Sequence, residues 1–79
     1  MMEQVALSGV EPGQRCRVEE IGLSGPLARR LMDLGLMEGT EAVCRLRGPW
    51  GDPVAFEVRG TVIALRAADA GQIFGRVER

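Results

Sequence analysis

The chain has 79 residues, of which 46% are apolar and 27% charged, so it can build one modest core but not two domains. Ten basic residues, all of them arginine, stand against eleven acidic ones and leave a net charge of −1. A general nucleic-acid-binding protein is usually distinctly basic. Histidine is absent, which removes the commonest general base near neutral pH and the commonest metal ligand.

Membrane and secretory segments are not indicated. No apolar run approaches the ~20 residues that a membrane-spanning helix needs. The opening residues, Met1 to Gln4, lack the basic start and the apolar stretch of a signal peptide. We therefore expect a cytoplasmic protein that does not insert into the membrane directly.

Eleven glycines and four prolines divide the chain into short segments. Several of these alternate between apolar and polar residues, which is typical of half-buried strands. The segment 5–14 ends in a Pro12-Gly13 turn. Strands are predicted over 15–19, 41–47, 54–58, 61–66 and 72–77, with one helical turn over 67–71. Ile21 is out of phase with Val18, which indicates a bulge or a strand end near Glu20.

One helix is predicted after the first of these strands. Ser24 is a candidate N-cap and Pro26 suits a first turn. Leucines at i, i+4 and i+7 make one apolar face: Leu27, Leu31 and Leu34. Gly35 suits the left-handed position that ends a helix, and Leu36 is expected to fold back onto Leu31, as in a Schellman ending.

The pattern predicts a single domain over residues 1–79, with a core from about 5 to 77. The fold class is mainly β: a small SH3-like antiparallel β-barrel of about five strands with one short inserted helix. A five-stranded OB barrel has the same contents. Two strands have expected inward faces, namely Ala42, Cys44 and Leu46 in one and Val54, Phe56 and Val58 in the other.

The segment from Arg29 to Gly39 reads RRLMDLGLMEG. It resembles the R-x-L-x-D-x-G-L-x-x-G core of the FeoA family, with Glu38 where that family usually has proline. Further family features occur in order and at matching spacing: the opening Leu7 to Gly13, then Gly51-Asp52-Pro53, Arg59-Gly60, the run Ile63 to Arg66, and Asp69-Ala70. The resemblance covers nearly the whole chain.

This resemblance implies a small cytosolic SH3-like domain. The implied function is a non-enzymatic accessory or regulatory role in ferrous iron uptake, through contact with the cytosolic part of a FeoB-type membrane GTPase transporter. The same fold occurs as the C-terminal domain of iron-dependent repressors, so a metal-responsive regulatory module is one alternative. A nucleic-acid-binding small barrel is another. We expect no cofactor, and without lysine the chain cannot contain a P-loop.

The helix and the turn after it form the predicted docking surface. Arg29, Arg30 and Asp33 are expected to orient a partner by charge, and Met37 to bury apolar area. Two further candidate partner-binding residues are Trp50, in a loop rich in turn formers, and Arg66, at the end of a strand. No nucleophile and base can be paired, so catalytic residues are not predicted.

Cys16 and Cys44 fall on inward strand faces and are predicted to be buried apolar thiols. Two cysteines without histidine are too few for the usual zinc sites. Outward arginines on two strands form a basic stripe that could contact RNA or an acidic partner, or simply face solvent: Arg15, Arg17, Arg45 and Arg47. A weak homo-oligomer is a further alternative, and the sequence leaves open whether it would form through a strand edge.

Overall fold

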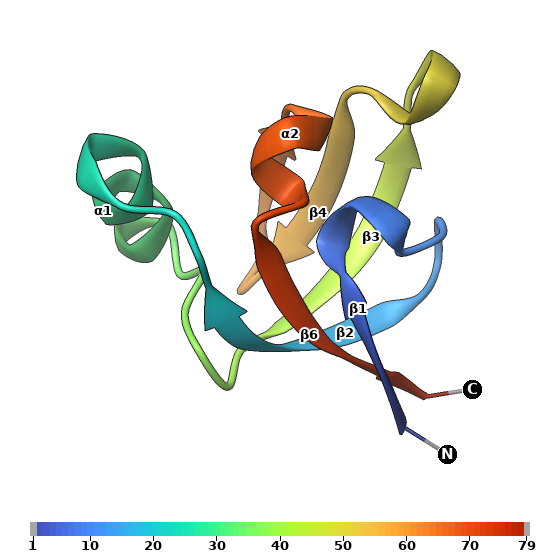
Figure 1. Ribbon diagram of the computed structural model, residues 1–79, viewed down its shortest axis with the longest axis horizontal. Coiled ribbons are helices and arrows are strands. Elements are labelled where there is room, and N and C mark those ends of the chain that lie inside the picture. The colour runs from blue at the N-terminus through green and yellow to red at the C-terminus, as the bar shows by residue number, and fades with distance from the viewer. Residues whose placement is uncertain (1, 79) are drawn as a thin grey trace.

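The computed structural model describes residues 2–78 and contains six strands and two short helices (Figure 1). The strands are β1 (Met2–Ala6), β2 (Arg15–Ile21), β3 (Glu41–Arg47), β4 (Val54–Val58), β5 (Thr61–Leu65) and β6 (Ile73–Glu78). The helices are α1 (Gly25–Asp33) and α2 (Ala67–Ala70), and single 3-10 turns lie at Leu7–Gly9 and Pro49–Gly51. The predicted mainly β architecture with one short inserted helix is confirmed.

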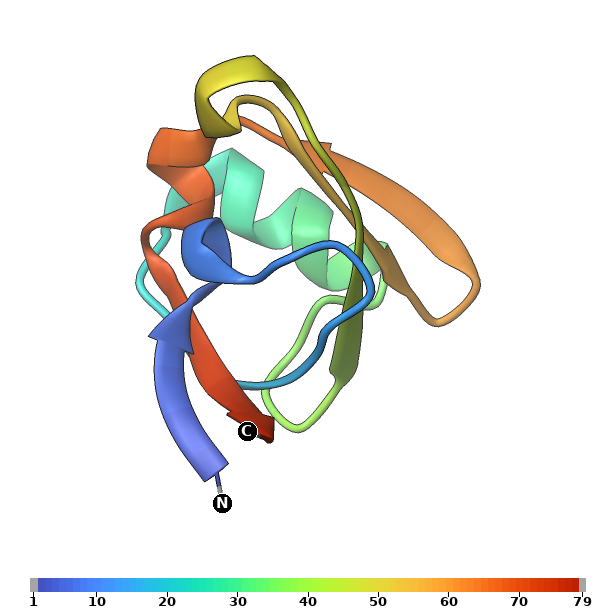
Figure 2. The ribbon, with the colours of Figure 1, turned by 90° about the vertical axis from the view of Figure 1, so that its right-hand side faces the viewer.

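All strand pairs are antiparallel and belong to one sheet in the order β1-β6-β2-β3-β4-β5. The sheet curls on itself around the core, as Figure 2 shows. In the part of the chain that the structure describes, β1 and β5 each pair on one side only. The curled sheet therefore keeps two edges.

Strand β1 is an addition to the predicted elements. It pairs along its length with β6, from Met2 opposite Glu78 to Ala6 opposite Phe74. The two ends of the chain therefore lie close together (Figure 1). Its partner strand lies at the other end of the sequence, so no local sequence pattern predicts the pairing. As a result α1 follows the second strand of the sheet.

The core is built from apolar side chains of nearly every element. Its largest fully buried members are Phe56, Leu7, Leu36, Ile73, Val10, Val18, Val54, Val58, Val77, Cys16 and Cys44. No polar or charged residue is buried among residues 2–78. Burial of this apolar area is the main stabilising contribution, at roughly 25 cal/mol per Å².

Two irregularities decide which side chains face the core. The register of β2 against β6 shifts between Val18 and Glu20, so of the two predicted alternatives, a bulge or a strand end, the structure shows the bulge. A second shift, between Cys44 and Leu46, occurs where β3 pairs with β4. It reverses the alternation after Cys44, so the prediction that Leu46 faces inward is wrong, and that side chain is 55% exposed.

The end of α1 has the predicted Schellman geometry. The Leu36 N–H donates to the Leu31 carbonyl at 2.9 Å and the Gly35 N–H to the Met32 carbonyl at 3.0 Å. Gly35 has φ 106°, which favours glycine. Leu31 and Leu36 both lie in the core cluster. At the other end Ser24 occupies the N-cap position, but its side chain makes no capping hydrogen bond.

Gly75 lets β6 pack closely against its neighbour β2. It pairs with Val18 of β2 and Val5 of β1. A Cβ at this position would collide with the Arg17 carbonyl oxygen and would lie 2.6 Å from the Cys16 sulfur. Strand β6, which pairs with a neighbour on each side, therefore needs a residue without a side chain here.

We predict that Gly75→Ala lowers the free energy of unfolding by about 1–3 kcal/mol, because the backbone must move to relieve the overlap. The matched control is Gly9→Ala, since a Cβ there meets nothing within 4 Å. Chemical denaturation of both variants measures the difference. Equal free energies of unfolding for Gly75→Ala and Gly9→Ala would show that β2 and β6 can shift apart without a loss of stability.

Candidate partner-binding surface

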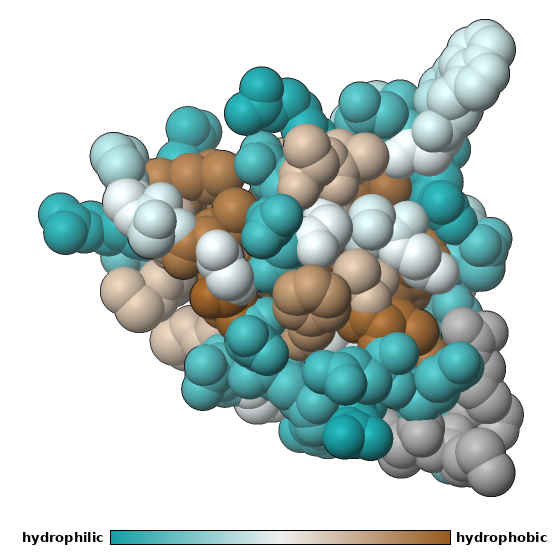
Figure 3. Space-filling model, viewed as in Figure 1, coloured by the Kyte–Doolittle hydropathy of each residue, from teal (hydrophilic) through white to brown (hydrophobic). Residues whose placement is uncertain are grey.

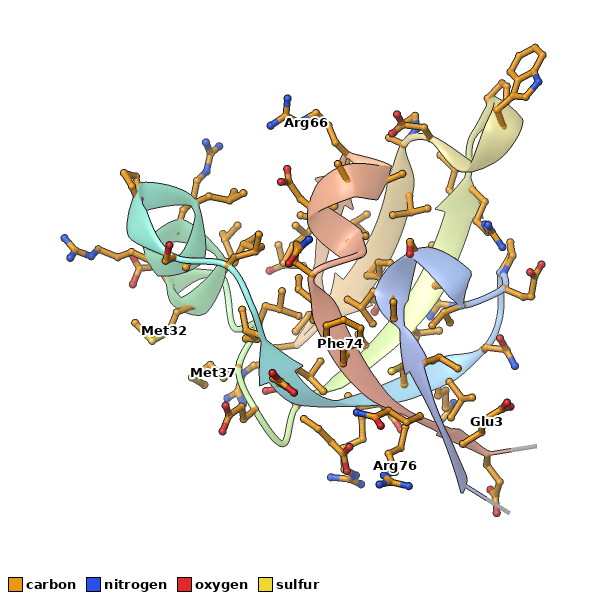
Figure 4. The ribbon with its side chains drawn as sticks, viewed as in Figure 1. Glu3, Met32, Met37, Arg66, Phe74 and Arg76 are labelled. Carbon is orange, nitrogen blue, oxygen red and sulfur yellow. The ribbon has the colours of Figure 1, made fainter. Side chains whose placement is uncertain are left out.

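A groove of about 510 Å³ runs beside α1, between the helix and the segments that enter and leave it. We call it the methionine groove, and it is lined by Ile21, Leu23, Ala28, Arg29, Met32, Leu36, Met37 and Glu38. Met32 and Met37 lie near one another at this end of the molecule (Figure 4). Figure 3 shows apolar side chains gathered there on the surface.

Helix geometry and the C-terminal cap place the two methionines. Met32 follows Leu31 directly, so it lies off the buried leucine face and is 53% exposed. The chain reverses at Gly35 and brings Met37 back beside the helix, with its side chain 39% exposed. Leu36 is buried and forms the floor between them. The result is a flexible apolar surface over a rigid base.

Charges stand along the rim of the groove. Arg29 and Glu38 contribute to its lining, and Arg29 also borders a shallow hollow shared with Arg30 and Asp33. Within residues 2–78, Arg29, Arg30 and Asp33 form no ion pair. The i,i+3 and i,i+4 pairs that their spacing permits are not formed, so all three charges face solvent.

The other two predicted site residues lie elsewhere. Trp50 is 99% exposed in the 3-10 turn Pro49–Gly51, which projects at the end of the molecule opposite α1 (Figure 1). Arg66 precedes α2, and its Nε atom lies 3.3 Å from an Asp69 carboxylate oxygen. The structure thus gathers Arg29, Arg30, Asp33 and Met37 around one helix, whereas Trp50 lies at the opposite end of the molecule and Arg66 directly after β5.

Of the eight residues that line the groove, sequence reasoning assigned only Arg29 and Met37 to the site, and the residues it missed include Ile21, Leu23 and Met32. Ile21 and Leu23 are half-buried side chains packed against the core. Met32 offered a usable signal, because a large apolar residue one position off the buried face of an amphipathic helix must point toward solvent or a partner.

Both cysteines are buried free thiols, as predicted. Burial raises the pKa of the Cys16 thiol to about 11, with a smaller contribution from Glu19. Burial also raises the pKa of Cys44. Both thiols are therefore protonated at neutral pH and weakly nucleophilic.

The basic stripe is largely neutralised by carboxylates. Arg15 lies 3.7 Å from Glu41, Arg45 2.8 Å from Glu57, and Arg47 2.6 Å from Glu11, in each case between a guanidinium nitrogen and a carboxylate oxygen. Arg17 donates to the Gly39 carbonyl at 3.2 Å. Such pairing leaves little net positive field for a phosphate backbone.

The described residues contain no group of three or more histidine, cysteine, aspartate or glutamate side chains placed to hold a metal ion. Among the same residues, no helix has the length and apolar character required to cross a bilayer.

A FeoA domain model matches residues 5–77. The solution structure of the Chlorobium tepidum FeoA protein is 29% identical, with a TM-score of 0.87 over 95% of this chain and 71% of that one. A FeoA-like protein of Clostridium acetobutylicum is 32% identical, with a TM-score of 0.81 over 100% and 92%. The zinc-complexed FeoA of Stenotrophomonas maltophilia, described as an SH3 domain protein, is 30% identical, with a TM-score of 0.75 over 87% and 86%. No curated protein matches the chain.

The raised thiol pKa of Cys16 predicts a loss of stability in alkali. The unfolded chain releases this proton near pH 9, whereas the folded chain keeps it until about pH 11. The free energy of unfolding should therefore fall across this window, by up to about 1.4 kcal/mol per pH unit from this one thiol. Histidine and tyrosine are absent and all basic side chains are arginine, so few other groups titrate there.

Urea denaturation at several pH values measures this slope. Cys16→Ala should reduce it and leave only the contribution of Cys44, whatever the variant costs in stability at pH 7. A slope unchanged in Cys16→Ala would contradict the assignment.

Proposed function

The chain belongs to the FeoA family, and we propose that it is a non-enzymatic accessory protein of ferrous iron uptake that binds the cytosolic part of a FeoB-type membrane transporter. The Stenotrophomonas maltophilia relative is described as a possible activating factor of bacterial ferrous iron transport. On this proposal the present chain acts in the cytoplasm and regulates the transporter by contact.

The observation that carries the proposal is the methionine groove. Met32 and Met37 expose flexible thioether side chains over the buried Leu36. Methionine adapts its shape to an apolar partner and is frequent at binding surfaces of this kind. A partner that covers the groove removes apolar area from water, which favours association.

The rim charges supply orientation. Arg29 and Arg30 lie on one side of the exposed helix face and Asp33 one turn further, all without ion-pair partners in the described chain. Unpaired charges of both signs favour one docking pose over others and add more to specificity and association rate than to affinity.

The size of the surface suits regulation. A single small barrel offers a contact of about 600–800 Å² per side, which is at the low end for stable complexes. Binding of this strength is transient, so the occupied fraction of the transporter can follow the concentration of the accessory protein.

A non-catalytic role also agrees with the side chains available. The thiols are buried, and their pKa values are raised by that burial. Five arginines form surface salt bridges with carboxylates. The neutralised arginine stripe gives less support to the nucleic-acid alternative.

The test is a calorimetric titration of the full chain into the isolated cytosolic domain of a FeoB-type transporter. Met32→Glu and Met37→Glu should each weaken binding at least about tenfold, equivalent to ~1.4 kcal/mol, because a charge must then be desolvated in the groove. Asp33→Arg reverses one rim charge, so it should change how steeply the affinity depends on salt concentration.

The matched control is Leu46→Glu, which places the same charge at an exposed apolar position on β3, outside the groove. It should bind like the unmodified chain. Unchanged affinity in both methionine variants would overturn this docking surface, and absence of binding by the unmodified chain would overturn the proposed partner.

A further inference from the structure

A second cleft, of about 280 Å³, lies on the other side of α1, between the helix and edge strand β5. We call it the edge cleft, and it is lined by Leu27, Arg30, Leu31, Leu34, Val62, Ile63, Ala64 and Leu65. The lining residues come from β5, from α1 and from Leu34, the C-cap residue of that helix. The cleft is separate from the methionine groove and shares no residue with it.

The wall of the cleft on the sheet side is the edge of β5 rather than one of its faces. Successive side chains of a strand point to opposite faces, and yet four consecutive residues, from Val62 to Leu65, border the same cleft. This is possible only where the strand presents its edge. In the described sheet β5 pairs with β4 alone.

The β4–β5 hairpin shows which backbone groups are free at that edge. Its two-residue turn has φ 51° at Arg59 and 82° at Gly60, as in a type I′ turn. The pair Val58 and Thr61 that flanks such a turn is hydrogen-bonded, and bonded pairs alternate along the strands. The N–H and C=O groups of Val62 and Ala64 therefore point away from β4.

This edge lacks the usual protection against pairing. The five residues of β5 read TVIAL, with no charge and no proline, and Val62 is 62% exposed. Natural sheets usually guard an open edge with charged residues, proline or a covering element. Here the nearest helix leaves a cleft along the strand, and most of the residues that line it are apolar.

Arginines border the edge cleft on the helix and at both ends of β5, and one of them, Arg66, is paired with Asp69. Arg30 is its one charged lining residue. Arg59 lies in the turn before β5, and Arg66 follows that strand directly. The aliphatic stem of Arg59 lies against Gly35, at the end of α1. No aspartate or glutamate lines the cleft.

We propose that the edge cleft binds an extended segment of a partner protein, apolar in its middle and acidic at its ends, which adds to the sheet as a strand beside β5. Its backbone pairs with Val62 and Ala64, its apolar side chains contact the leucines of α1, and its acidic ends meet Arg59 and Arg66. About five residues match the length of β5.

An acidic segment fits this edge better than a second copy of the chain. If two β5 strands paired antiparallel, the Arg59 end of one copy would lie beside the Arg66 end of the other, and like charges would face each other. This inference does not depend on the proposed function, because it concerns a different cleft, which shares only Arg30 with the proposed docking surface, and a different kind of contact.

The test uses a synthetic peptide, Asp-Val-Thr-Val-Thr-Val-Asp, titrated into the isotope-labelled full chain and followed by NMR. The amide resonances of Val62 and Ala64 should shift, and their hydrogen exchange should slow at least tenfold. A peptide with lysine in place of both aspartates should bind at least tenfold more weakly.

Ala64→Pro removes an outward N–H that β4 does not use, and proline is tolerated at such edge positions. It should abolish peptide binding, whereas Ala64→Thr should retain it. The proposal fails if the peptide leaves β5 unaffected, if folded Ala64→Pro binds equally well, or if the lysine peptide binds as tightly. Slowed exchange of β5 that grows with protein concentration in the absence of peptide would identify a second copy as the occupant and overturn the acidic segment.

Discussion

The attachment of α1 to the barrel is the constraint on which the rest of the surface depends. The helix is held by Leu31, which lies in the core cluster, by Leu27, which packs against that cluster, and by the cap in which the Leu36 and Gly35 N–H groups bond to the Leu31 and Met32 carbonyls. Because the helix is short and anchored along one stripe, it cannot cover the sheet on both sides. The methionine groove and the edge cleft are the two spaces that this narrow attachment leaves.

The sheet supplies the rigid support beneath that helix. Strand β6 pairs with both β1 and β2, and the absence of a side chain at Gly75 leaves room for the Arg17 carbonyl oxygen and the Cys16 sulfur of β2. The two chain ends are thereby joined in neighbouring strands, and the core beneath them contains only apolar side chains and two protonated thiols. Such a close-packed core holds the surface residues of the domain in defined positions.

The two surfaces beside α1 differ in the contacts they can make. The methionine groove offers adaptable side chains and rim charges of both signs, which suits a folded face of a partner. The edge cleft offers backbone hydrogen bonds and a row of arginines, which suits an extended acidic segment. Occupation of both by one partner would raise the overall affinity through effective concentration, although each contact alone is weak.

Local patterns in the sequence determined much of this protein. Turn residues and alternation placed the strands from Arg15 onward, the leucine spacing and Gly35 placed the helix and its cap, and the segment from Arg29 to Gly39 indicated the family. These features depend on interactions between residues close in the chain, so they can be read without coordinates.

Only the tertiary structure decided the remainder. The pairing of β1 with β6 and the edge position of β5 join or separate segments distant in sequence. The bulge after Cys44 turned Leu46 outward, and the projection of the Pro49–Gly51 turn put Trp50 at the opposite end from the helix. Each depends on how strands register and pack across the whole sheet, and no local pattern of residues contains that information.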